Sequence, residues 1–146
     1  MKMVNDQLPG ILVAVPEFRK LDTMAALLKN RGADVLRVPL VAIHDAHNPA
    51  PVLAWIRAFC EQPPDLFMIL TGEGVRRLLS LANRFGLRDH FVEALGSTTT
   101  LCRGPKTERA LREVGLKGNL QASAPTTEGV IKTLEDMPVE GRRIAV

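Results

Sequence analysis

The feature that most constrains the fold is a strict alternation of short apolar runs with amphipathic segments, which begins at Asp65. The apolar runs cover residues 66–70, 99–102, 120–122 and 143–146, and apolar residues recur at helical spacing between them. A strand buried on both faces is typically a continuous apolar run, and a helix between two such strands makes them parallel. The alternation therefore predicts an α/β fold with an open parallel sheet and helices on both faces.

The first part of the chain predicts a separate β-α-β unit. Ile11–Val15 and Asp34–Val38 are strand-like runs, and a helical pattern lies between them, which implies a right-handed crossover and a parallel pair. Pro39 breaks the second run, after which the chain continues extended. We therefore expect residues 1–38 to form the first β-α-β unit of an incomplete domain 1, residues 39–48 an extended linker, and residues 49–146 a parallel α/β domain 2.

Three loops follow the carboxyl ends of the predicted strands: Thr71–Gly74, Arg103–Thr107 and Ala124–Gly129. Ligands of open α/β sheets, such as Rossmann and flavodoxin-like folds, bind beyond these strand ends. Each loop also opens a helix, where free N–H groups and the helix dipole favour an anion. Pro105 suits a first helical position, and Thr126 is a natural N-cap. The loops predict an anion site, and the alternative is ordinary helix capping.

Composition narrows the class of ligand. The net charge is +3, and Lys and Arg never run longer than two, which favours small anions over nucleic acid. One Trp, five Phe and no Tyr leave no platform on which bases could stack. No apolar run is long enough for a membrane span or a signal peptide, so we expect a cytoplasmic protein. In a reducing compartment Cys60 and Cys102 are expected to be buried thiols.

Other familiar chemistries lack their motifs. Gly72, Gly74 and Arg77 follow a strand at the spacing of a dinucleotide fingerprint, but Arg77 stands where the third glycine belongs. There is no P-loop and no nucleophile elbow. His44 and His47 have no acidic or Cys partner at metal-ligand spacing, so no metal is predicted. No acid–base pair stands out, and the catalytic residues of any enzyme activity stay unknown.

Taken in order, the loop motifs resemble the uroporphyrinogen-III synthase family. The matching segments span essentially the whole chain, and their order and spacing carry the resemblance. They are Gly32–Val35 leading to Pro39, Thr71–Val75, Arg103–Thr107 with Ala110, Leu111, Gly115 and Leu116, Ala124–Gly129, and Gly141–Val146.

The resemblance implies two α/β domains joined by a pair of extended segments. It implies closure of linear hydroxymethylbilane to uroporphyrinogen III, with loss of water, inversion of the last pyrrole ring and no cofactor. The substrate carries several carboxylates, and backbone amides and hydroxyls of the loops would hold it. The substrate-binding positions carried over by motif are Thr71, Gly72, Gly74, Arg103, Gly104, Lys106, Thr107, Thr126 and Thr127.

The sequence departs from the family's pattern in three respects. Ala14-Val15-Pro16 stands where the family often has Thr-Arg-Pro, no Tyr exists to take the role of the family's proposed catalytic tyrosine, and the chain ends inside the second domain. We therefore expect an impaired synthase-like lyase, with self-association through residues 11–38. Two alternatives stay open: a non-catalytic tetrapyrrole- or anion-binding regulatory module, and an unrelated Rossmann-like nucleotide binder.

Overall fold

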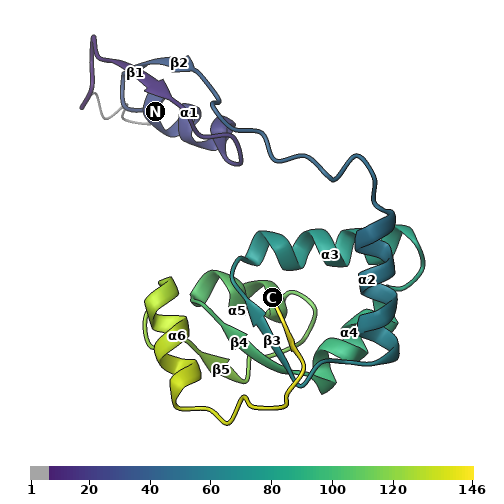
Figure 1. Cartoon of the computed structure of the whole chain (residues 1–146). Coiled ribbons are helices and arrows are strands. Elements are labelled where there is room, and N and C mark those ends of the chain that lie inside the picture. Colours follow the sequence, from purple (N-terminus) through teal and green to yellow (C-terminus); the bar gives the residue numbers. More distant parts are fainter. Residues whose placement is uncertain (1–6) are drawn as a thin grey trace. The chain divides into compact units, whose positions relative to one another are not determined.

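The computed structural model describes residues 7–146, and the chain divides into two compact units at His44 and Asp45. We call residues up to His44 unit 1 and residues from Asp45 onward unit 2 (Figure 1). The assignment of domains 1 and 2 with a linker at residues 39–48 stays a prediction, and each unit is described by itself.

Unit 1 is a single β-α-β motif. It consists of β1 (Leu12–Val15), α1 (Leu21–Lys29) and β2 (Asp34–Arg37), and the two strands are parallel. Ala25 of α1 is fully buried and Val15 nearly so, because α1 covers one face of the strand pair. Leu12 and Leu36 belong to the other face and are 66% and 50% exposed. Among the described residues this face is uncovered.

Unit 2 confirms the predicted alternation and the parallel sheet. The four strands are parallel neighbours in the order β5-β4-β3-β6. The elements are α2 (Ala50–Glu61), β3 (Leu66–Ile69), α3 (Gly72–Arg84), α4 (Arg88–Ser97), β4 (Thr99–Cys102), α5 (Pro105–Arg112), β5 (Leu120–Gln121), α6 (Thr127–Glu135) and β6 (Ile144–Ala145).

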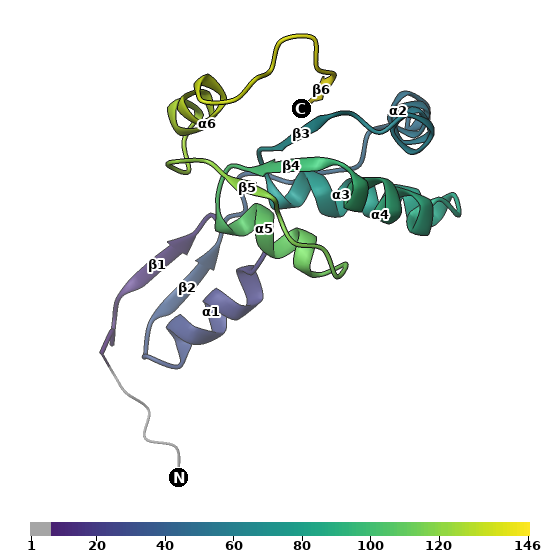
Figure 2. The same cartoon turned by 90° about the horizontal axis from the view of Figure 1, so that it is seen from below.

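Helices cover both faces of this sheet, as predicted. The chain steps from β3 to β4 to β5 in one direction, so right-handed crossovers place α3, α4 and α5 on one face. The last crossover returns from β5 to β6 beyond β3, which places α6 on the opposite face (Figure 2). Successive residues of β3 alternate accordingly: Phe67 belongs to the larger core with α2–α5, and Leu66 to the smaller core with Val130 of α6.

The larger core is built around aromatic rings. The ring centroid of Phe59 in α2 lies 5.4 Å from that of Phe67 in β3 and 5.3 Å from that of Phe91 in α4. The ring of Trp55, also in α2, is tilted against Phe59 at 5.1 Å. Such tilted and edge-on contacts add to the free energy gained by burying the rings. This cluster holds α2 and α4 to the sheet.

The expected burial of Cys60 was wrong, and one large apolar side chain of α6 is exposed. Cys60 is half-buried rather than inward, because the buried stripe of α2 continues from Ile56 to Phe59. Ile131 is 52% exposed, because the buried face of α6 is centred on Val130 and its neighbour is turned about 100° away. Cys102 is a buried thiol, as expected.

Candidate functional site

The three loops singled out in the sequence lie next to one another at the carboxyl ends of β3, β4 and β5. A Cβ atom added to Gly72 would overlap the carbonyl oxygen of Lys106 and lie 3.1 Å from its carbonyl carbon. One added to Gly104 would lie 3.1 Å from Cβ of Pro125. The loop after β3 therefore touches the loop after β4, which in turn touches the loop after β5. We call residues 71–74, 103–107 and 124–129 the rim loops.

Three glycines of the rim loops are buried and stand where backbones approach closely. Gly72 meets Lys106, Gly104 meets Pro125, and a Cβ added to Gly129 would lie 2.6 Å from the backbone nitrogen of Ala124. Gly74, in contrast, is exposed. The arrangement gives the buried glycines a packing role, which keeps the amino ends of α3 and α5 adjacent.

The N-cap threonines differ in what their hydroxyl groups can still do. The Oγ1 atoms of Thr71 and Thr126 accept the N–H groups of Gly74 and Gly129 at 3.0 and 3.1 Å. The pKa of Glu128 is lowered first by its own backbone N–H and then by a hydrogen bond with Thr126, which engages that hydroxyl. Thr71 is exposed and its hydroxyl retains a proton to donate. Thr127 is also exposed, at the first position of α6.

Thr107 is directed inward. It is 2% exposed, and its hydroxyl donates to the carbonyl of Gly104 at 2.5 Å and accepts the Gly104 N–H at 3.3 Å. The Thr107 hydroxyl therefore acts as both donor and acceptor within the turn. The contacts support a role for Thr107 in holding the shape of the loop.

Replacing Thr107 by valine is expected to lower the free energy of unfolding by about 1–3 kcal/mol, because the buried N–H and carbonyl of Gly104 lose a partner. Thr107→Ser keeps the hydroxyl and is expected to recover most of the loss. Urea unfolding followed by circular dichroism measures both variants. Equal stability of the valine variant and the wild type would contradict this role.

The cationic side chains of the rim loops have no carboxylate partner within residues 7–146. Arg103 is half-buried and Lys106 is exposed, and neither forms an ion pair there. Glu73, in the first turn of α3, is held by Arg77 at 2.9 Å. Free N–H groups at the starts of α3 and α5 add positive potential beside Arg103 and Lys106. The site is therefore suited to carboxylate or other anionic groups.

Ion pairs also fix the helices behind the rim loops. Arg76 of α3 donates two hydrogen bonds to the Glu113 carboxylate, just after α5, at 2.7 and 2.8 Å. Asp45 accepts from Arg77 at 2.6 Å and from Arg84 at 3.4 Å. Sequence reasoning missed Asp45, because its partners lie 32 and 39 residues away. The Glu73–Arg77 and Glu108–Arg112 pairs do have a local signal, because each is spaced i,i+4 on one helix.

The Arg76–Glu113 pair predicts a pH effect. The hydrogen bond from Arg76 holds the pKa of Glu113 below its ordinary value. A lowered native pKa stabilises the fold above the ordinary pKa, and this contribution is lost as pH falls through the native pKa. Glu113→Gln is expected to remove a small, salt-sensitive part of the stability at neutral pH and to flatten its acid dependence. Urea midpoints from neutral to acidic pH measure this, with the exposed Glu93→Gln on α4 as control; parallel curves for Glu113→Gln and wild type would contradict it.

The remaining chemistry of the described residues is limited. Within residues 7–146, no three His, Cys, Asp or Glu side chains gather as a metal site requires. None of the helices in that range is both long and apolar enough to cross a bilayer. No nucleophile–base pair occurs among the rim loops.

The comparisons with known proteins point to one family. The family model described as Uroporphyrinogen-III synthase HemD matches residues 22–146. Uncharacterized protein YjjA of Bacillus subtilis (strain 168) is 29% identical over 138 residues, which cover 94% of this chain and 50% of that protein.

Solved structures agree with this match. A mutant uroporphyrinogen III synthase of the extremely thermophilic bacterium Thermus thermophilus has a TM-score of 0.69 and 27% identity, over 85% of this chain and 47% of that one. The wild-type enzyme in another crystal form has a TM-score of 0.57 and 29% identity, over 86% of this chain and 47% of that one. The chain thus spans about half the length of the proteins that it matches. Because the family match extends over most of the sequence, this chain belongs to the uroporphyrinogen-III synthase family.

Proposed function

We propose that the rim loops bind hydroxymethylbilane and that the chain is a synthase-like lyase with impaired cyclisation. The observation that carries the proposal is the junction of the three loops through Gly72 and Gly104, in a chain of this family. Binding is assigned to exposed Thr71 and Gly74, to Arg103 and Lys106, and to the starts of α3 and α5. Impaired cyclisation is inferred for these 146 residues taken by themselves, because they include no Tyr and span half the length of their relatives.

The proposed mechanism is orientation. Carboxylates of the bilane are held by Arg103, Lys106 and the helix N–H groups, which fixes the curvature of the linear chain. Its hydroxyl departs with a proton as water, and the substituted carbon of the last pyrrole attacks the cation that remains. The attack makes that carbon quaternary, so its bond to its original bridging carbon breaks. The bridging carbon, now the cation, bonds to the unsubstituted carbon of the same ring, and loss of the proton there restores the pyrrole in its inverted orientation, with no change of oxidation state. Holding the reacting carbons together favours this closure over the unassisted one to the symmetric isomer. No general acid is assigned.

A coupled assay that separates the two uroporphyrin isomers tests the activity. The 146-residue chain is expected to shift the ratio toward type III only weakly, while a full-length relative shifts it strongly. Binding without any shift would favour the second candidate, a non-catalytic tetrapyrrole-binding module, which the absence of Tyr also favours. If the chain neither binds the substrate nor shifts the isomer ratio, both candidate functions are overturned.

Lys106→Glu is expected to weaken binding of uroporphyrinogen III about tenfold or more, because it replaces an attractive charge by a repulsive one beside the same carboxylates. Lys117→Glu makes the same change in charge at an exposed position before β5 and is the matched control. Anaerobic fluorescence titration gives both dissociation constants. Equal weakening by the two variants would mean that net charge, and not this position, governs binding.

A further inference from the structure

Each of the three helices that begin at the rim loops carries one glutamate in its first turn. A basic residue stands four positions further along each helix, where it can reach that glutamate across one turn. The three pairs of positions are Glu73 and Arg77 in α3, Glu108 and Arg112 in α5, and Glu128 and Lys132 in α6. The helix starts share this pattern of charge, but their carboxylates take different partners.

In α3 and α5 an arginine draws the carboxylate toward the following turn. Nε of Arg77 lies 2.9 Å from the Glu73 carboxylate, and Nη2 of Arg112 lies 2.6 Å from that of Glu108. A guanidinium presents several donors in a fixed plane, which suits it to hold a carboxylate in one position. The first N–H groups of these two helices therefore keep their positive potential for a ligand.

The carboxylate of Glu128 stays at the start of α6. In the described part of the chain it forms no ion pair, either with Lys132 or with another residue. Its own backbone N–H and the Thr126 hydroxyl donate to it, and these bonds lower the pKa of Glu128, the backbone bond most. It is therefore ionised at neutral pH. The start of α6 carries a negative charge where α3 and α5 offer positive potential.

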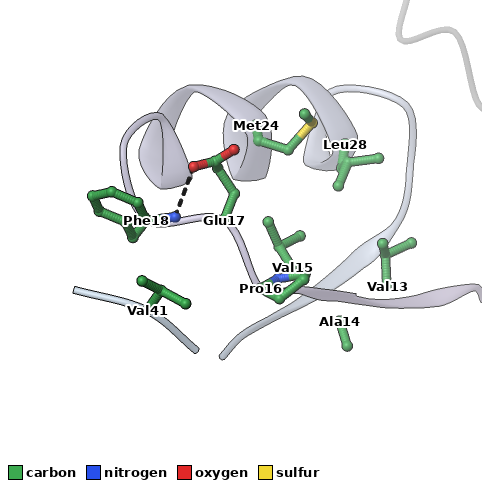
Figure 3. A pocket seen from close by; sticks show the side chains of 9 residues that line it. All are labelled: Val13, Ala14, Val15, Pro16, Glu17, Phe18, Met24, Leu28 and Val41. Atoms are coloured by element: carbon green, nitrogen blue, oxygen red, sulfur yellow. Dashed lines mark hydrogen bonds between the residues drawn. The ribbon is translucent and has the colours of Figure 1, made fainter. Parts of the chain in front are cut away.

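Glu17 in unit 1 is a second glutamate that no arginine holds at this spacing, since the residue four positions on is Leu21. Its carboxylate also turns to the backbone. It accepts the N–H groups of Phe18 and Arg19, both at 3.0 Å, and Figure 3 shows the bond to Phe18. A carboxylate held in this way occupies backbone donors that could otherwise bind an anionic ligand.

We propose that Glu128 is a specificity-determining residue, which excludes ligand carboxylates from the loop after β5 and confines them to the starts of α3 and α5. Since this assignment concerns the carboxylates of the same tetrapyrrole, it rests on the proposed function. The loop that carries Glu128 touches the loop that carries Arg103 and Lys106, through Pro125 and Gly104. Like charges repel and unlike charges attract at such close range. The rim loops thus distinguish one orientation of the ligand from the reverse.

Glu128→Gln is expected to tighten binding of uroporphyrinogen III about threefold, because it removes a repulsion that solvent and salt already weaken at an exposed position. The amide oxygen of glutamine can still accept the backbone N–H, so the start of α6 is kept. Anaerobic fluorescence titration gives the dissociation constants, and circular dichroism verifies the helices.

Glu135→Gln is the matched control for this substitution. It makes the same change in net charge at the exposed last residue of the same helix, and it is expected to leave the dissociation constant unchanged. Equal tightening by both variants would mean that net charge governs binding, and the proposal would be overturned. Unchanged or weaker binding by Glu128→Gln would overturn it as well.

Amide chemical shifts separate a failure of this proposal from a failure of the proposed function. Tricarballylate, a small tricarboxylate, is titrated into the isotope-labelled full chain, and the backbone N–H signals are followed by NMR. In the wild type the signals of Glu73 and Lys106 are expected to shift while that of Thr127 stays, and in Glu128→Gln the Thr127 signal is expected to shift as well.

Two outcomes of the titration would overturn the role of Glu128: a Thr127 signal that already shifts in the wild type as much as the other two, or three signals that do not move. The expected shifts together with no binding of uroporphyrinogen III would instead overturn the proposed function. In that case the exclusion of carboxylates by Glu128 would stand, and the rim loops would serve a smaller anionic ligand.

Discussion

Gly72→Ala is expected to lower the free energy of unfolding by about 3 kcal/mol or more, the upper end of what overpacking costs. The added methyl group would overlap the carbonyl oxygen of Lys106, a backbone atom that cannot rotate aside. Relief requires α3 to move away from α5, which also opens the ion pair between Arg76 and Glu113. Urea unfolding of unit 2 gives the loss, and the rim loops are expected to lose uroporphyrinogen binding as the helix starts separate.

Gly96→Ala is the matched control for this substitution. Gly96 lies in α4, and its added Cβ would be 3.4 Å from Cδ2 of Leu116, an ordinary contact. In a helix, alanine is favoured over glycine by up to about 1 kcal/mol. Gly96→Ala is therefore expected to be neutral or slightly stabilising. If both variants behaved alike, the close approach of Gly72 to Lys106 would not be what holds the rim loops together.

The sequence could predict the elements of the fold because their signals are local. Continuous apolar runs identified β3 and β4, and helix starts were marked by Thr71, Pro105 and Thr126. The position of β6 beside β3 has no such signal. The position of β6 is set by the face of the sheet that the last crossover covers. Only two residues of β6 pair with β3, so the strand itself carries little local signal.

The candidate site was predictable in place but not in detail. Parallel strands bring their following loops to one edge, so the neighbourhood of Gly72 and Gly104 follows from the fold class. The sequence interpretation assigned both glycines and Thr107 to substrate. The structure gives them contacts with Lys106, Pro125 and the turn itself, and these depend on helix packing that no local pattern encodes. Whether each residue also touches substrate stays a prediction.

Phe91→Ala is expected to lower the free energy of unfolding of unit 2 by about 3–5 kcal/mol, a large share of the stability of a small domain. Phe91 is 0% exposed, and its ring lies 5.3 Å from Phe59 and 6.3 Å from Trp55. Truncation removes the side chain through which α4 packs on α2 and leaves a cavity between helices that cannot fully collapse. Urea unfolding and the fluorescence of Trp55, the only tryptophan, report the change.

Phe85→Ala is the control, because this ring is 45% exposed just after α3 and is absent from the core cluster. Its loss is expected to stay below about 1 kcal/mol, since little buried area changes. The aromatic cluster belongs to α2, α4 and β3, whereas the rim loops are joined through Gly72 and Gly104. Phe91→Ala should therefore weaken uroporphyrinogen binding only in proportion to the unfolded fraction. Gly72→Ala should weaken uroporphyrinogen binding even where unit 2 remains folded in the absence of denaturant. If the two variants showed the reverse, the helical core, rather than the contacts of the rim loops, would shape the site.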